Sequence, residues 1–383
     1  MHLGISALNI RGGGGRTHLV EVLAAAEPHK HGFERVTLWS GQSTLDCVED
    51  RPWLHKIHCP EVEGSFLSRI LWERFSLHRV ARDAKVDLLF APGGVYTGRF
   101  HPFVAMSQNM LPFERKERKR FGLTKTSLRY LLLRITQANT FRKADGVIFL
   151  SEYARSAITK QLSMAKVMTE IIPHGIDDSF RKKPRVQQRL TNYSIHNPFR
   201  FVYVSIINFY KHQWNVARAV ATLRNEGLPA CIQFVGPAHP PALKHFRAVQ
   251  EKLDPDRTFI KYTGAIPYKD LPSKYHNSDA FVFASSCENM PNILLEAMAS
   301  GLPIACSNLG PMPEVLGDAG IYFDPESPGQ IVEALGKLCK DEDLRKACAD
   351  KAFAAAQRYT WNRTAQKTFS FLGCVAEMNA VPS

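Results

Sequence analysis

The sequence predicts an α/β protein made of two Rossmann-like, doubly wound domains. Short apolar runs of strand length recur along the chain with helical stretches between them, an alternation typical of parallel sheets covered by helices on both faces. The length of 383 residues is greater than that of most domains with a single hydrophobic core, so the chain is expected to form two domains. We expect the first domain at residues 1–178, a linker at 179–198, the second domain at 199–360 and a terminal helix at 361–383.

The first domain is expected to contain five strands. They fall at residues 3–8, 35–39, 86–91, 103–106 and 146–150. Gly12 to Gly15 follow the first strand and lead into a helix near Leu19, so backbone N–H groups there can approach an anion or a sugar closely. A plain flexible turn is the alternative, because neither the dinucleotide-binding spacing nor a P-loop is present.

The second domain is expected to follow a polar, basic linker that contains two prolines. Its strands are predicted at residues 200–206, 231–236, 259–264, 280–284 and 319–324, and helices between residues 329 and 357 close the domain. The Asp-x-Asp sequence Asp254-Pro255-Asp256 precedes a strand and therefore lies at the wrong end of the sheet for a metal–nucleotide role. We expect it to form a turn.

The segment from Asp279 to Ser307 is predicted to run strand, turn, helix, turn, strand. Its first strand is apolar throughout, as in a parallel strand buried on both faces. Pro291 suits the first turn of a helix, and Gly301 suits the left-handed position just past its end. The helix is therefore expected at residues 291–300.

A narrow polar stripe of Asn292, Glu296 and Ser300 interrupts this otherwise apolar helix. A buried glutamate is costly unless a polar group meets it, so the stripe is expected to face a cleft. Glu288 lies in the turn before the helix, so both carboxylates approach a helix N-terminus, which attracts phosphate. Ligands of open α/β sheets bind at this edge. We interpret it as a nucleotide-sugar site.

Glu288 and Glu296 form the Glu-x7-Glu pair of retaining glycosyltransferases of the GT-B fold. The surrounding sequence, ENMPNILLEAMASGLPIACSNLGPMPEVLGDAGIYFDP, closely resembles glycosyltransferase family 4 (group 1). The resemblance extends more loosely from the glycine-rich N-terminal segment to about Tyr359. It implies two Rossmann-like domains that face a cleft, and a C-terminal helix from Trp361 that crosses back to the first domain.

The resemblance also implies roles for individual residues. Glu288 would contact the donor sugar, Glu296 the ribose hydroxyls, and Lys211 the donor diphosphate, for which a compact ammonium is well suited. Both glutamates have a structural alternative, as loop or first-turn carboxylates, and any of the 49 basic residues could fall by chance at the place of Lys211. Further donor-binding candidates are Ser205, Gly264, Ala265, Asn289, Met290, Pro291, Asn292, Ile293 and Leu294.

The residues expected at the acceptor or cleft side come from the first domain. They are Gly13, Gly14, Gly15, His18, Gln108, Asn109 and His174. Many family members carry a histidine at the place of Gln108, and a glutamine cannot take a proton. This departure fits a mechanism in which the phosphate of the donor serves as the base. His174 is expected to be a turn residue rather than a catalyst. Where the family often has arginine this chain has Ile206, which leaves Lys211 and the helix N-terminus with more of the phosphate binding.

Basic residues are concentrated in one part of the chain. The net charge is +13, and residues 115–143 hold ten basic residues against Glu117 alone. Basic and apolar residues alternate there, as in a helix that lies on an anionic bilayer. An ordinary amphipathic helix with one solvated face fits the same pattern. A peripheral membrane contact from Arg115 to Lys143 is therefore one of two open interpretations.

The cysteines and the apolar segments of the sequence indicate in which cellular compartment the protein is expected. Eight scattered cysteines without a CxxC pair argue against a zinc ribbon or a disulfide framework. Neither a signal peptide nor a run of 18 apolar residues is visible. We expect a cytoplasmic protein, with peripheral binding to the cytoplasmic face of the inner membrane as the alternative.

These observations predict a retaining hexosyltransferase. It would move a sugar from a nucleotide-diphosphate donor to a glycan or lipid-linked acceptor in surface polysaccharide or lipopolysaccharide synthesis, with no cofactor and no metal. Another GT-B enzyme, a nucleotide-sugar epimerase or a phosphorylase, is the alternative. A nucleic-acid-binding protein would leave the two-glutamate helix unexplained, so no nucleic acid is expected as a partner.

Overall fold

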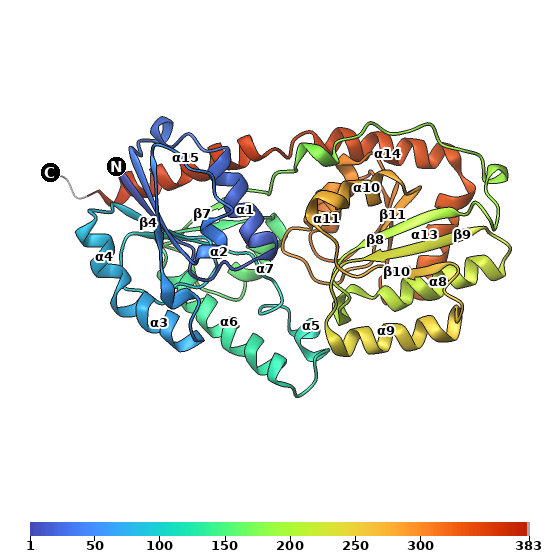
Figure 1. The fold of residues 1–383 in the computed structure, drawn as a ribbon, viewed down its shortest axis with the longest axis horizontal. Helices are drawn as coiled ribbons and strands as arrows, with labels where there is room; N and C mark the ends of the chain where they lie inside the picture. The colour runs from blue at the N-terminus through green and yellow to red at the C-terminus, as the bar shows by residue number, and fades with distance from the viewer. Residues whose placement is uncertain (381–383) are drawn as a thin grey trace. The chain divides into compact units, whose positions relative to one another are not determined.

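A computed structural model describes residues 1–380 and contains two parallel sheets, each with helices on both faces (Figure 1). The chain divides into two compact units. Unit 1 comprises Met1–Arg118, Gly122–Gly175 and the chain from Tyr359 onward, and unit 2 comprises Lys119–Phe121 and Ile176–Arg358. The predicted α/β class with two Rossmann-like halves is confirmed.

Unit 1 is built on a seven-stranded sheet in the order β3-β2-β1-β4-β5-β6-β7. Its strands are β1 (His2–Ser6), β2 (Arg35–Ser40), β3 (Leu54–His58), β4 (Leu88–Ala91), β5 (Phe103–Met106), β6 (Gly146–Phe149) and β7 (Met168–Ile171). Its helices are α1 (Gly13–Ala24), α2 (Gln42–Leu45), α3 (Phe66–Phe75), α4 (Leu77–Asp83), α5 (Arg115–Lys119), α6 (Lys125–Lys143), α7 (Glu152–Thr159) and α15 (Trp361–Asn379), with 3-10 turns η1 (Pro28–His31) and η2 (Pro60–Val62). Every strand pairing is parallel.

The five strands predicted for this unit are present, and two further strands were not predicted. β4, β5 and β6 are buried at every position, which explains their unbroken apolar sequences. The two missed strands are β3 and β7, the edges of the sheet. Three of the five residues of β3 are histidine or lysine, and every residue of β7 is only half-buried. An edge strand needs less apolar sequence, so the pattern is weak there.

Unit 2 is built on a six-stranded sheet in the order β10-β9-β8-β11-β12-β13. Its strands are β8 (Phe199–Val204), β9 (Ala230–Val235), β10 (Ile260–Tyr262), β11 (Ala280–Phe283), β12 (Ile304–Ser307) and β13 (Ile321–Phe323). Its helices are α8 (Gln213–Asn225), α9 (Pro240–Leu253), α10 (Leu271–His276), α11 (Asn292–Ala299), α12 (Met312–Leu316), α13 (Pro328–Lys340) and α14 (Glu342–Ala356), with 3-10 turns η3 (Asp178–Phe180), η4 (Leu190–Asn192), η5 (Phe209–Lys211) and η6 (Tyr268–Asp270). Aromatic side chains of β8, β9 and β11 fill its core.

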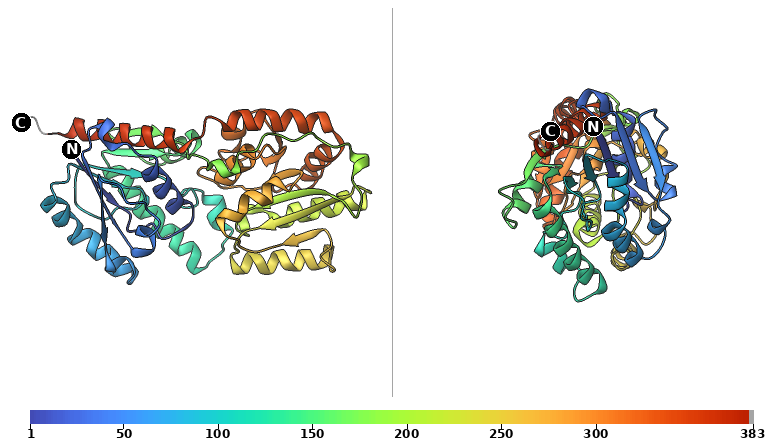
Figure 2. Two further views of the ribbon diagram at one scale, coloured as in Figure 1. Left: turned by 45° about the horizontal axis from the view of Figure 1, so that its top comes forward. Right: turned by 90° about the vertical axis from the view of Figure 1, so that its left-hand side faces the viewer.

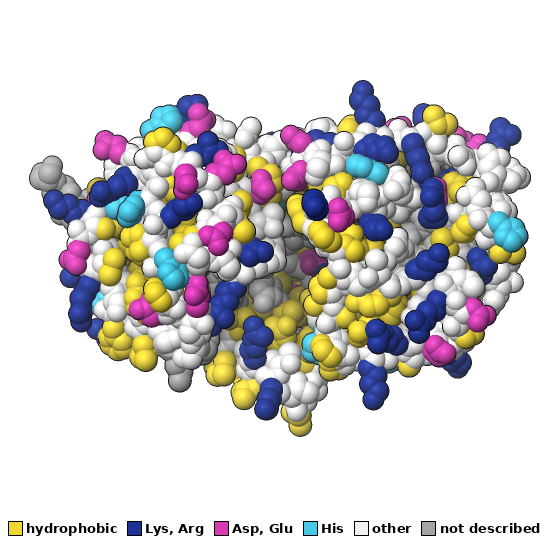
Figure 3. Space-filling model, viewed as in Figure 1, with side chains coloured by type: hydrophobic (Ala, Val, Ile, Leu, Met, Phe, Trp, Pro, Cys, Tyr) yellow, Lys and Arg dark blue, Asp and Glu magenta, His cyan; other side chains and the backbone are white. Residues whose placement is uncertain are grey.

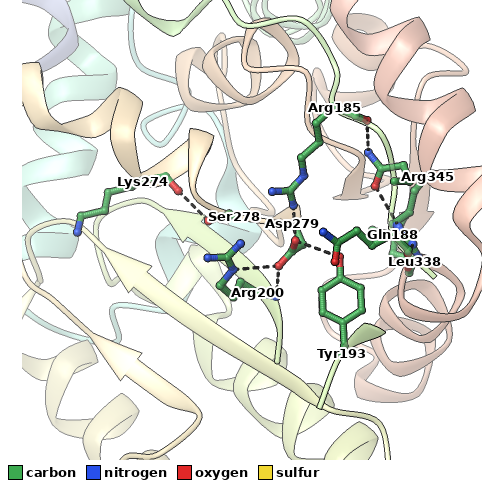
Figure 4. A network of polar contacts seen from close by, with 10 residues as sticks. Arg185, Gln188, Tyr193, Arg200, Lys274, Ser278, Asp279, Leu338 and Arg345 are labelled. Carbon is green, nitrogen blue, oxygen red and sulfur yellow. Dashed lines mark hydrogen bonds and ion pairs between the residues drawn. The ribbon is translucent and has the colours of Figure 1, made fainter. Parts of the chain in front are cut away.

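The segment at residues 179–198, expected to be a linker, is part of unit 2. Two buried groups hold it there (Figure 4). Asp279 forms an ion pair with Arg185 and accepts a hydrogen bond from the Tyr193 hydroxyl at 3.1 Å. Arg345, which is fully buried, donates to the Gln187 amide at 3.1 Å and to the Gln188 carbonyl. Residues of this segment, such as Arg185 and Tyr193, therefore bind side chains elsewhere in unit 2.

The terminal helix α15 belongs to unit 1, where it packs beside α1 and β4 (Figure 2). Thr360 caps its first turn, and the Thr364 hydroxyl donates to the Pro173 carbonyl at 2.8 Å. Glycine is required at position 175, because a Cβ there would lie 2.4 Å from the Trp361 nitrogen. No helix within residues 1–380 combines the length with the hydropathy that a membrane span needs.

Candidate functional site

The candidate site lies at the carboxyl edge of the unit 2 sheet. β8 pairs with β11 in parallel, so the loops after these two strands leave the sheet at the same edge. The chain continues from β8 to β9 on one side and from β11 to β12 on the other, so the order of the sheet reverses between β8 and β11. Such a reversal leaves a crevice where open α/β sheets bind ligands. Lys211 follows β8, and Glu288 follows β11.

Lys211 and Glu288 form an ion pair within unit 2. The side chains are 6% and 15% exposed, so the ammonium is held away from water while the carboxylate keeps some access to it. The Lys211 Nζ also lies 5.2 Å from the ring centre of Tyr210 and 5.1 Å from that of Phe283. Aromatic faces stabilise a desolvated ammonium. The site therefore holds a buried cation whose one carboxylate partner, among the residues that the structure describes, is Glu288.

The loop that carries Glu288 is fixed by hydrogen bonds to the loop that carries Lys211. The Ser285 hydroxyl donates to the Glu288 carboxylate at 2.5 Å. The Ser286 N–H donates to the Tyr210 carbonyl at 2.8 Å, and the Ser286 hydroxyl lies 3.0 Å from His212 Nε2. His212 adopts a left-handed φ of 50°, which is unusual outside glycine and clusters at functional sites. Hydrogen bonds thus join the two loops.

Glu296 lies on α11 and is almost completely buried. The Tyr275 hydroxyl donates to its Oε2 at 2.8 Å. The pKa of Glu296 is raised from 4.5 to about 7, chiefly by burial, while the hydrogen bond from Tyr275 acts in the opposite direction and the charge of Asp177 adds to the rise. Within residues 1–380, no hydrogen bond or ion pair links Glu296 to Lys211 or Glu288.

The start of α11 differs from the expectation. The helix begins at Asn292 rather than Pro291, which is its N-cap, and it ends at Ala299 before the left-handed Gly301. Two of the backbone N–H groups expected to meet a phosphate, those of Asn292 and Leu294, already donate to the carbonyls of Met290 and Pro291. The N–H of Ile293 is the remaining candidate among them. Pro291 has none to offer.

The other donor-binding candidates surround the same edge of the sheet. Asn289 and Met290 are buried in the loop before α11. Ser205 directly follows β8, and its hydroxyl donates to the Ile206 carbonyl at 3.2 Å. Gly264 follows β10 with a φ of 79° and accepts a hydrogen bond from the Gly236 N–H, while the neighbouring Ala265 is exposed. Their roles in binding stay predictions.

Among the unit 1 candidates, the glycine run differs from the loop that was expected. Gly13 to Gly15 form the first turn of α1, and Gly13 has a φ of 63°. Gly15 and Gln108 are neighbours, because a Cβ at Gly15 would lie 2.7 Å from Gln108 Oε1. The Gln108 amide donates weakly to the Met106 sulfur at 3.3 Å, and the Asn109 carbonyl oxygen accepts from the Leu111 N–H at 3.1 Å.

His18 and His174, also candidates, are brought together with Trp361. The Nδ1 atoms of the two histidines lie 2.8 Å apart, so one ring donates to the other. Both are buried beside the indole, with ring centres 5.8 and 6.0 Å from it. Burial lowers the pKa of His174 to about 4 and that of His18 well below its usual range. Both rings are therefore neutral near pH 7. That His174 is a turn residue rather than a catalyst stays a prediction.

The structure also shows the conformation of the sequence Asp254-Pro255-Asp256. Asp254 accepts hydrogen bonds from the backbone N–H groups of Thr258, Phe259 and Ile260, which confirms a turn. Across residues 1–380, no three His, Cys, Asp or Glu side chains are grouped as a metal site requires. Whether the reaction uses a metal stays a prediction.

Several residues of these clusters were not singled out from the sequence. Ser285 could have been found, because it follows a buried strand at the sheet edge where ligands bind. Tyr275 and Trp361 could not, since each lies far along the chain from its partner and a single aromatic residue carries no pattern. His212 is marked only by its backbone conformation, which the sequence does not display.

Two family comparisons cover most of the chain. Residues 12–180 match the family described as Glycosyltransferase Family 4, and residues 188–354 match the family described as Glycosyl transferases group 1. The second match contains Lys211, Glu288 and Glu296.

Individual relatives and solved structures share at most about a third of their residues with this chain over the aligned parts. An O-antigen chain mannosyltransferase B of Escherichia coli is 33% identical over 112 residues, which is 29% of each chain. A GDP-mannose-dependent alpha-(1-6)-phosphatidylinositol monomannoside mannosyltransferase of Mycobacterium tuberculosis is 28% identical over 243 residues, 60% of this chain and 61% of that protein. The chain thus spans less than two thirds of these curated relatives. The sucrose-phosphate synthase of Thermosynechococcus elongatus shares the fold, with a TM-score of 0.73, 16% identity and coverage of 96% and 97%.

Proposed function

Since the chain belongs to the glycosyltransferases of family 4 and group 1, we propose that it transfers a hexose-type sugar from a nucleoside-diphosphate donor to a glycan or glycolipid acceptor. The observation that carries the proposal is the Lys211–Glu288 pair at the reversal point of the unit 2 sheet. A buried cation at this edge is suited to a diphosphate.

Lys211 is proposed to stabilise the departing diphosphate. Breaking a sugar–phosphate bond places negative charge on the leaving oxygens, and a cation already fixed in a desolvated site stabilises that charge strongly. In the structure the ammonium is paired with Glu288. The donor would offer it a partner of higher charge, and the Glu288 carboxylate would then be released to accept a hydrogen bond from a sugar hydroxyl.

Glu296 is proposed to receive the ribose. One of its oxygens accepts from Tyr275, which fixes the carboxylate and leaves its other oxygen to accept from a ribose hydroxyl. The Ile293 N–H would complete the phosphate contacts at the start of α11.

The acceptor is proposed to bind to unit 1, near Gly15 and Gln108. Gln108 can orient a hydroxyl but cannot take its proton. We therefore propose that the donor phosphate accepts the proton and that the anomeric configuration is retained. The Asp254 carboxylate is occupied by backbone N–H groups, and Lys211 supplies the positive charge, so no divalent metal is proposed. Activity that EDTA abolishes and Mg²⁺ restores would contradict this part.

The donor and the pathway are proposed from the relatives. Two of them are mannosyltransferases by name, one of O-antigen chains and one of a phosphatidylinositol mannoside. GDP-mannose is therefore the first donor to test, and a surface polysaccharide or lipopolysaccharide is the proposed product. The expected cytoplasmic location and a peripheral contact of residues 115–143 with anionic membrane belong to this proposal.

The decisive experiment follows the sugar. The purified chain is incubated with a panel of nucleotide sugars and a lipid extract, and the products are separated and examined by NMR. We expect release of a nucleoside diphosphate together with a new glycoside that retains the anomeric configuration of the donor. An inverted product would contradict the mechanism. Epimerised donor without acceptor, or consumption of inorganic phosphate, would contradict the proposed reaction.

A further inference from the structure

His212 has an unusual backbone conformation directly beside Lys211. Its φ is 50°, in the left-handed region where residues other than glycine are uncommon. Glycine adopts this conformation without strain, so the backbone geometry alone does not explain a histidine at this position. The His212 residue is almost completely buried, with 2% of its surface exposed. A buried polar side chain at a strained position indicates that the side chain itself contributes to the site.

The His212 ring contacts the loop that carries Glu288. Its Nε2 atom lies 3.0 Å from the Ser286 hydroxyl oxygen. The Ser286 hydroxyl also donates to the Tyr210 carbonyl at 3.2 Å, and the Ser286 N–H donates to the same carbonyl at 2.8 Å. A hydroxyl has one proton, and a carbonyl can only accept. The Ser286 proton therefore points to the Tyr210 carbonyl, and His212 Nε2 is the donor to the Ser286 oxygen.

Ser286 thus binds the chain on both sides of Lys211. It donates to the carbonyl of Tyr210, the residue before the lysine, and accepts from the ring of His212, the residue after it. The Lys211 carbonyl itself accepts from the buried Tyr203 hydroxyl at 2.6 Å. Hydrogen bonds therefore fix the chain at each residue from Tyr210 to His212.

A fixed main chain matters at Lys211 because the charge of this residue is common but its placement is not. Lysine and arginine side chains are spread over the visible surface (Figure 3), whereas the Lys211 side chain is 6% exposed. In the proposed function, a diphosphate replaces Glu288 as the partner of the ammonium. A cation stabilises a departing phosphate best when it is already in place, and residues that hold it there reduce the entropy lost on binding.

We propose that His212 is a positioning residue that acts through Ser286 to hold Lys211 in place for the donor diphosphate. This role rests on the proposed function and adds to it a residue that takes no direct part in bond breaking. The ring serves as a hydrogen-bond donor at Nε2 and not as an acid or a base. A glutamine side chain, which carries an amide nitrogen that can donate, should therefore replace it.

The test compares two variants of similar length at the same left-handed position. His212→Gln keeps a donor nitrogen, whereas His212→Met has none. The backbone strain is shared, so the two variants should have similar melting temperatures. Calorimetry measures the affinity for GDP and UDP, and product release measures kcat. We expect His212→Gln to stay within about threefold of wild type in both, and His212→Met to bind the nucleotide about tenfold more weakly, as for the loss of one hydrogen bond.

A double-variant cycle tests whether His212 acts through Ser286. His212→Met/Ser286→Ala should bind the nucleotide no more weakly than the weaker of the two single variants, because both changes remove the same hydrogen bond. Losses that add in the double variant would overturn the proposed route.

The tautomer can be measured without a ligand. Nitrogen NMR of the wild-type chain with labelled histidine, assigned with His212→Gln, should show a proton on His212 Nε2. A proton on Nδ1 alone would overturn the proposed hydrogen bond.

The remaining outcomes separate this role from the proposed function. Wild-type affinity and turnover in His212→Met would overturn the role of His212 and leave the proposed transfer reaction intact. Loss of transfer in His212→Gln at unchanged nucleotide affinity would show that the ring acts as an acid or a base, which contradicts a positioning role. A wild-type chain that binds neither GDP nor UDP and transfers no sugar would overturn the proposed function together with this role.

Discussion

Replacing Glu296 by glutamine should change how the stability of the protein depends on pH. The pKa of this carboxyl is about 7 in the folded chain against an ordinary value of 4.5, because the group is buried. Between these two pH values the folded chain holds a proton that the unfolded chain has lost. Stability therefore falls as pH rises from 4.5 to 7, and the loss is complete above 7.

The size of the effect follows from the shift. One pKa unit corresponds to about 1.4 kcal/mol, so a rise from 4.5 to about 7 amounts to about 3 kcal/mol of unfolding free energy. An amide does not titrate, so Glu296→Gln removes the pH dependence of the unfolding free energy that comes from this carboxyl. The difference in stability between the variant and wild type should move by about 3 kcal/mol in favour of the variant between pH 4.5 and pH 8.

Urea titrations of both proteins at several pH values measure this difference, and other titrating groups cancel in the comparison. Glu333→Gln, at an exposed position on α13, is the control and should follow the wild-type profile. Parallel profiles for wild type and Glu296→Gln across this range would refute the assignment of a buried, protonated Glu296.

Three further predictions concern the site and the fold. If the ribose binds the ionised form of Glu296, donor affinity measured by calorimetry should fall about tenfold for each pH unit below 7, and a flat profile would contradict that role. Glu288→Gln should abolish sugar transfer while the chain keeps its fold, with a lower melting temperature because Lys211 loses its buried partner; normal turnover would remove Glu288 from the mechanism. Arg345→Ala removes a fully buried guanidinium that donates to Leu338, Cys339, Gln187 and Gln188, so urea unfolding should show a loss of about 3 kcal/mol or more, and a loss below about 1 kcal/mol would contradict its anchoring role.

Much of the fold was predictable because central parallel strands are apolar at every position. β5 and β11 were predicted for this reason, and so was the sheet edge at which Lys211 and Glu288 meet. Edge strands such as β7 carry too little apolar sequence to be recognised. In residues 179–198, Arg185 looks like a solvated residue in the sequence, and its partner Asp279 becomes visible only in the structure.

The site was predictable only where the chemistry lies close together in sequence. Glu288 and Glu296 share one turn and helix, so their common location followed from spacing. The burial of Glu296 against Tyr275 did not, because α10 and α11 meet only in the folded sheet. The pairing of Lys211 with Glu288 also joins residues far apart in the chain and becomes visible only through the adjacency of β8 and β11.

Binding of nucleoside diphosphates to wild type and Lys211→Ala tests the central claim most directly. Calorimetry with GDP and UDP should detect binding of at least one by wild type, and the variant should bind it about 10 to 100 times more weakly, as expected for loss of a charge-assisted hydrogen bond. Lys340→Ala, which removes the same charge from the exposed face of α13, should bind like wild type. Unchanged affinity in Lys211→Ala would contradict a donor diphosphate docked on this ammonium.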